Sequence, residues 1–215
     1  MIEPQLNEVE VRVLGSLIEK SVTTPENYPL SLNSLVNACN QKSNRDPVVE
    51  YDSATVGEAL TSLRTKGLAR IIMGGDSRVP KYQHYFEEMY HLSMAESAAI
   101  CELMLRGPQT PSEVRGRIER FNVHLSPTAV EDLLTGLQTR AEPLLKLLPR
   151  QPGRREARFA HLLAGEPVVR DEAESTTPRP ARDERLTTLE EEVQHLRQEL
   201  DALRQQFAEF QKQFE

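Results

Sequence analysis

The chain has 215 residues, enough for one large domain or two small ones. Hydrophobic residues make up 38% and aromatic residues 5%, with no tryptophan, so part of the chain is expected to lie outside any packed core. The net charge of −7 is unevenly distributed, because residues 1–165 carry 19 basic and 20 acidic residues and residues 166–215 carry 7 and 13. This balance argues against a strong, non-specific nucleic-acid binder.

Sequence features that mark a cell compartment point to the cytoplasm. The first residues, MIEPQLNEVEV, lack the basic and apolar regions of a signal peptide, and no run of about 18 apolar residues predicts a membrane span. Cys39 and Cys101 each lie on an apolar helical stripe, so we expect buried free thiols rather than a disulfide or an active site. We therefore expect a reduced, cytoplasmic protein with no membrane partner.

The first 90 residues predict three helices followed by a β-hairpin. In chain order, these are a helix from Leu6 to Lys20, a helix capped by Ser31, a helix capped by Asp52 or Ser53 that ends at Gly67, and strands at 68–73 and 81–85. A Gly-Gly-Asp turn at residues 74–76 joins the two strands. Three helices followed by a hairpin is the order of a winged helix.

The same order then repeats. Capping boxes open helices at Ser93 and Thr110, Ser126-Pro127 opens a third, and strands follow at 144–148 and 158–163. Matching segments of the two halves are offset by 74, 76 and 77 residues, which indicates a tandem duplication. We predict a mainly α protein with small β-hairpins, built from winged-helix domains at 1–90 and 91–165. A single core continuous across residues 5–165 would contradict this interpretation.

The last 50 residues differ from the rest of the chain in composition and in hydrophobic pattern. Residues 166–183 are rich in Pro, Glu, Ser, Thr and Arg and predict a flexible linker. Residues 184–215 carry a strict heptad from Leu186 to Phe214, with leucine, valine and phenylalanine at every a and d position. The g and e′ positions of a parallel pair have opposite charges, so we expect a parallel homodimer through residues 186–214. The rival is that this helix folds back on its own domain.

The stretch from Thr24 to Pro47 is the most unusual part of the chain, because it holds five of the seven asparagines. Four of them, Asn33, Asn37, Asn40 and Asn44, recur at helical spacing. One interpretation is a polar recognition surface, since an amide offers donors and an acceptor to a base edge or a peptide. The other is that the amides cap helix ends and tie down the loop. The candidate recognition residues are Asn27, Tyr28, Asn33, Asn37, Asn40, Asn44 and Arg45.

The string TPENYPLSLNSLVNACNQKSNRDPV, together with the repeated (K/R)-(Y/F)-x-H in both hairpins, resembles the YceH-like family of uncharacterised bacterial proteins. The resemblance covers about residues 5–165 and leaves the linker and the heptad helix outside. It implies a tandem winged-helix fold in the bacterial cytosol, and it supplies no activity.

The sequence offers little for an enzyme. It contains no Walker A, G-x-S-x-G, H-E-x-x-H or C-x-x-C motif, so we expect no catalytic residues, no metal and no cofactor. His84 and His161 occupy equivalent hairpin positions in separate repeats, so they are not expected to share a metal. We expect each to pack against its strand and to donate to a neighbouring backbone group.

Binding to double-stranded DNA is the expectation from the fold, because the third helix of a winged helix often enters the major groove. In the first repeat this helix offers polar residues, whereas its counterpart in the second carries Glu131 and Asp132, which would repel phosphate. The candidate DNA-binding residues are Thr55, Ser62, Arg64, Arg115, Arg117, Arg150, Arg154, Arg155 and Arg158. The alternative is a protein-docking module without DNA contact, which would be sensitive at Asn33 and Asn37 and would depend only weakly on salt.

Overall fold

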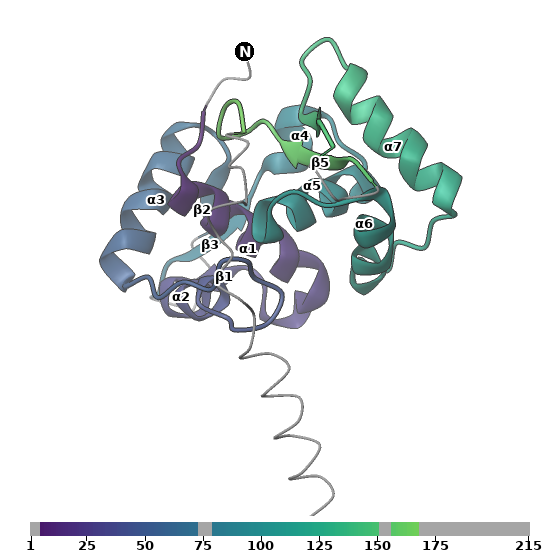
Figure 1. Cartoon of the computed structure of the whole chain (residues 1–215). Helices are drawn as coiled ribbons and strands as arrows, with labels where there is room; N and C mark the ends of the chain where they lie inside the picture. Colours follow the sequence, from purple (N-terminus) through teal and green to yellow (C-terminus); the bar gives the residue numbers. More distant parts are fainter. Residues whose placement is uncertain (1–4, 73–78, 151–155, 168–215) are drawn as a thin grey trace, which may run out of the picture. The chain divides into compact units, whose positions relative to one another are not determined.

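The computed structural model describes residues 5–72, 79–150 and 156–167 (Figure 1). In the first half, the elements are α1 (Glu8–Thr23), η1 (Pro25–Asn27), β1 (Leu30–Ser31), α2 (Leu32–Cys39), α3 (Ser53–Thr65), β2 (Ala69–Ile72) and β3 (Lys81–His84). They are followed by α4 (Phe86–Tyr90), α5 (Met94–Arg106), α6 (Pro111–Ile118), η2 (Glu119–Phe121), α7 (Pro127–Thr139), β4 (Leu145–Leu148) and β5 (Arg158–His161). The described chain is therefore mainly helical, with small antiparallel sheets.

Most of the linker, the heptad helix at 184–215 and the proposed homodimer contact at 186–214 lie outside the described residues. The flexible linker, the heptad helix and the homodimer therefore stay predictions.

Side-chain caps fix where the helices begin, as the sequence predicts. The side chains of Ser31, Asp52, Ser93, Thr110 and Ser126 each accept a hydrogen bond from a backbone N–H in the first turn of the helix that follows. At Ser93 and Thr110 the glutamate three residues on returns a bond to the cap, which completes both predicted capping boxes.

The first sheet has the strand order β1-β3-β2 and the second pairs β4 with β5. The sequence analysis predicted neither the two-residue strand β1 nor the short helix α4. In the second half, Gln109 forms a β-bridge with Phe159, as Leu30 of β1 pairs with Tyr82 in the first. Tyr82 and Phe159 are matching residues of the two hairpins. The second half therefore has a single β-bridge at the place where the first sheet has the strand β1.

The repeat is visible in where matching elements begin. α3 and α7, which have 13 residues each, start 74 residues apart, β2 and β4 start 76 apart, and β3 and β5 start 77 apart. These offsets equal the predicted ones. The boundaries of the domains, at 90 and 165, stay a prediction.

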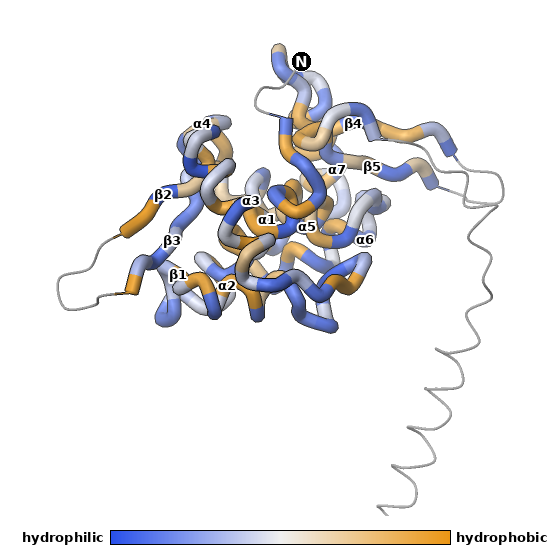
Figure 2. The backbone as a smooth tube through the Cα atoms, turned by 90° about the vertical axis from the view of Figure 1, so that its left-hand side faces the viewer, coloured by the Kyte–Doolittle hydropathy of each residue, from blue (hydrophilic) through white to orange (hydrophobic). Residues whose placement is uncertain are grey.

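One hydrophobic cluster includes buried residues from both halves, so the expectation of two separate cores is not met. Helices α1 and α5 meet in the middle of both views, and Figure 2 shows apolar stretches on them. A Cβ atom on Gly15 of α1 would lie 3.0 Å from Cδ2 of Leu105 on α5, so glycine allows the close approach. Beside it, the Cys101 thiol donates to the Gly15 carbonyl over 3.2 Å.

A buried network of charges crosses the same contact. Glu19 of α1 accepts from Arg45 over 2.5 Å and also pairs with Arg120 of η2. Arg120 in turn donates to Glu102 of α5 over 2.6 Å. Burial alone would raise the pKa of Glu19, but the hydrogen bonds and charges of the two arginines lower it below its ordinary value. The Glu19 carboxylate therefore ties the loop after α2 to the second half.

Substitution Glu19→Gln is expected to lower the free energy of unfolding by about 3 kcal/mol, because it leaves the buried Arg45 guanidinium without a counter-charge. Urea unfolding of the full chain at neutral pH measures this loss. Lys146→Ala, which removes an exposed pair with Glu166, is the control and should change stability by less than about 0.5 kcal/mol. Equal small effects of the two variants would contradict the structural role of the network.

Candidate binding surfaces

The asparagine stripe divides into exposed and structural members. Asn33 and Asn37 are exposed on α2. The Asn40 amide donates to the Tyr51 carbonyl over 2.7 Å and accepts from its N–H over 2.8 Å. Asn44, which has a positive φ of 58°, accepts a hydrogen bond from Arg106. The structural interpretation therefore holds for Asn40 and Asn44, whereas a recognition surface at Asn33 and Asn37 stays a prediction.

Arg45 and Tyr28 require a correction to the predicted recognition surface. Arg45 is only 5% exposed, because its guanidinium donates to Glu19 and to the Ala38 carbonyl at 2.8 Å. The Tyr28 hydroxyl accepts from the backbone N–H of His84 over 2.7 Å, and its ring packs against the core. Neither polar group is presented to a partner. Asn27 is exposed and donates to the neighbouring Glu26 carboxylate.

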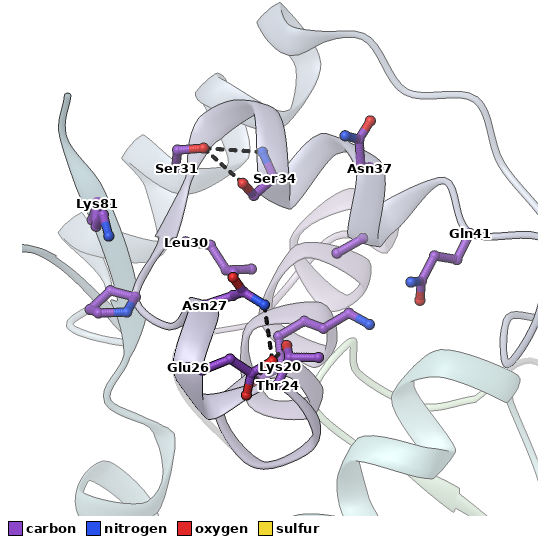
Figure 3. Close-up of a pocket in the computed structure, with 12 residues that line it drawn as sticks. Lys20, Thr24, Glu26, Asn27, Leu30, Ser31, Ser34, Asn37, Gln41 and Lys81 are labelled. Carbon is purple, nitrogen blue, oxygen red and sulfur yellow. Dashed lines mark hydrogen bonds between the residues drawn. The ribbon is translucent and has the colours of Figure 1, made fainter.

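An open groove of about 470 Å³ runs beside α2 (Figure 3). Its polar lining includes Lys20, Ser34, Asn37, Gln41 and Lys81. These residues come from the end of α1, from α2 and the loop after it, and from β3. Sequence analysis missed Lys20 and Lys81 as site residues, since nothing in the sequence indicates that two lysines 61 positions apart border one groove.

The candidate DNA-binding residues of α3 differ in how exposed they are. Thr55 and Ser62 are half-buried, and Ser62 helps to stabilise the Glu10 carboxylate. Arg64 is exposed near the end of the helix. On the adjacent hairpin, the exposed guanidinium of Arg70 stacks over the Tyr85 ring, 3.6 Å from its centroid.

The predicted cations of the second half that the structure describes differ in their exposure and in their partners. Arg158 donates to the Pro108 carbonyl over 2.8 Å and pairs with Glu113. The Glu113 carboxylate therefore neutralises the charge of Arg158. Arg115 and Arg117 are half-buried on α6, and Arg150 is exposed after β4. Arg154 and Arg155 lie outside the described residues. Glu131 and Asp132 are exposed on α7, as expected.

The cysteines and histidines form no reactive centre among the described residues. Cys39 and Cys101 are buried free thiols, as predicted, and burial raises the pKa of Cys39 to about 11. His84 accepts from the Phe86 N–H rather than donating to the backbone, and its other ring nitrogen bonds Ser21. Within the described ranges, no group of three or more His, Cys, Asp or Glu side chains is placed to hold a metal ion. No described helix is long and apolar enough to cross a bilayer.

Comparison with known proteins places the chain in a family. The profile described as "Protein of unknown function, DUF480" matches residues 6–154. A UPF0502 protein of Geobacter sulfurreducens is 53% identical, with 100% of both chains aligned, and one of Geotalea daltonii is 54% identical over 98% of both. The chain belongs to the DUF480/UPF0502 family.

The resemblance found from the asparagine-rich string is thereby confirmed. A UPF0502 protein of Opitutus terrae is 50% identical over 88% of this chain and 82% of its own length. The family profile ends at residue 154, but the Geobacter alignment runs through the whole chain. The C-terminal segment is therefore shared with that relative and is not particular to this chain.

Asn40→Ala should lower the free energy of unfolding by about 1–2 kcal/mol, because it leaves both backbone groups of Tyr51 without their partner. Asn33→Ala, on the exposed side of α2, should change it by less than about 0.5 kcal/mol. Chemical denaturation of both variants gives the comparison. A larger loss for Asn33→Ala would contradict the division of the stripe.

Because the His161 ring is buried, we expect the free energy of unfolding to depend on pH. Its Nδ1 is buried without a hydrogen-bond partner among the described residues, and burial lowers the pKa of the ring to about 4. Because the unfolded chain takes up the proton near pH 6.5, stability is lost as the pH falls from there toward the folded pKa. This loss amounts to about 2 kcal/mol between pH 7 and pH 5.

In His161→Gln, the loss between pH 7 and pH 5 should be smaller than in the parent chain by that amount. Urea unfolding at both pH values measures it, and His124→Gln, at an exposed histidine, is the control. A parent chain and His161→Gln variant with the same pH dependence would show that His161 does not titrate as proposed.

Proposed function

We propose that this protein is a non-enzymatic binding protein built from two winged-helix units that share one hydrophobic core, and that the first unit contacts double-stranded DNA. Supporting this fold, each half has three helices followed by a hairpin, and the segment between its first two helices pairs with the second hairpin strand. In winged helices, the third helix and the hairpin are the elements that reach DNA, so α3, β2 and β3 form the proposed interface.

The observation that carries the proposal is the contrast between α3 and α7. Arg64 is exposed on α3, where the matching position on α7 is the half-buried Gln138. Arg70 of β2 has no carboxylate partner among the described residues, whereas the matching Lys146 pairs with Glu166. A phosphate backbone is attracted by unneutralised cations, so the first half is the better surface for it.

A second candidate is docking of another protein, and the exposed asparagines of α2 favour it. Asn33 and Asn37 lie on the surface, although asparagine lowers the helix propensity of a segment that glutamate or lysine would keep soluble. On this candidate, Asn33→Ala and Asn37→Ala would weaken binding, whereas Arg64→Ala and Arg70→Ala would not.

The DNA proposal predicts that a labelled duplex of random sequence binds the full chain at low salt, with an affinity that falls steeply as salt is added. Arg64→Ala and Arg70→Ala should each weaken binding roughly five- to tenfold and reduce the salt dependence by about one ion. Fluorescence anisotropy at several salt concentrations measures both quantities.

The matched controls are Gln138→Ala and Lys146→Ala at the equivalent positions of the second half, and neither should change the affinity. Absence of binding at low salt would rule out the DNA proposal. Equal weakening by Lys146→Ala would show that the contact depends on overall charge and not on the first half.

A further inference from the structure

The groove beside α2 carries a cation at each end. In Figure 3, Lys81 of β3 lies at the end formed by Ser31, and the amino group of Lys20 points toward the end formed by Gln41. The side chain of Ser34 lies on α2 between them, and Asn37 lies further along α2 with its amide directed away from Lys20 in this view. A ligand that used both lysines would therefore have to run along the groove.

Both ammonium groups are able to receive a new anion. Lys81 is exposed and has no carboxylate partner among the described residues. Lys20 lies 3.7 Å from Glu19, but that carboxylate already binds Arg45 and Arg120. A ligand carboxylate would thus form charge-assisted hydrogen bonds with lysines that no other anion fully occupies.

The groups between the lysines suit a peptide backbone. Ser34 and Asn37 are three residues apart on α2, a rise of about 4.5 Å, and both line the groove. The Gln41 carbonyl oxygen accepts from Arg45 over 3.2 Å, which leaves the Gln41 NH₂ group as a donor. Amide side chains offer both a donor and an acceptor, which is what a peptide bond requires.

We propose that this groove binds an extended, acidic segment of a partner protein, with carboxylates of the segment on Lys20 and Lys81. One feature disfavours a nucleic acid here. Of the described residues that line it, none is aromatic, so a base would have no side chain to stack on. The groove shares strand β3 with the proposed DNA interface, but its two cations are Lys20 and Lys81 and not Arg64 and Arg70.

The probe is a set of fluorescein-labelled synthetic peptides in which two glutamates are separated by a variable number of serine and alanine residues. Anisotropy titrations with the full chain should show tightest binding at one separation, because the two lysines are fixed in space. Lys20→Ala and Lys81→Ala should each weaken binding of that peptide at least about tenfold. Asn37→Ala should weaken it by a smaller factor.

Lys42→Ala, which removes an exposed lysine outside the groove lining, is the matched control and should leave binding unchanged. No binding of any peptide at low salt, or binding without a preferred separation, would overturn the proposal. So would displacement of the peptide by duplex DNA in the Arg64→Ala variant, since the groove would then be a nucleic-acid site. Failure of the DNA proposal alone leaves the peptide measurements unaffected, because the two surfaces use different residues.

Discussion

The crossing of α1 and α5 determines how the two halves of the described chain are held together. Gly15 lets the backbones approach, and a few residues further along α1 the Glu19 carboxylate pairs with arginines from both halves. A buried charge is stable only with its partners in place, and separation of the halves would break the Glu19–Arg120 pair. The two halves of the described chain therefore share a common core.

The same network also shapes the surface beside α2. Arg45 reaches from the buried pair to Gln41, at the edge of the groove, and Arg12 of α1 donates to the backbone carbonyls of Cys39 and Pro47. The long loop between α2 and α3 is therefore held at several points from inside. Its irregular backbone needs these partners, because the loop has few hydrogen bonds of its own. This explains why part of the asparagine-rich stretch is structural and only its outer members remain available for binding.

Local patterns predicted the helices well, because period, caps and glycine stops are properties of neighbouring residues. Asp52 and Gly67 bound α3 for reasons that a short stretch of sequence contains. Strand β1 was missed because two residues carry no alternation to detect. The ion network could not be foreseen either, since Glu19 and Arg120 are 101 positions apart and each looks like an ordinary surface charge. For the same reason Arg45 was assigned to a recognition surface, and the two lysines of the groove were overlooked.

Comparing the halves position by position indicates where function resides. Their helices and hairpins match, so the core explains what they share, and their outer faces are where they differ. Lys146 and Arg158 of the second hairpin are neutralised by Glu166 and Glu113, whereas the matching Arg70 and Lys81 of the first have no carboxylate partner among the described residues. Unpaired charge adds nothing to the packing of a core, and at the surface it attracts ligands. The half that retains it is the half in which both proposed binding surfaces lie, and α5 of the second half packs against α1 of that half.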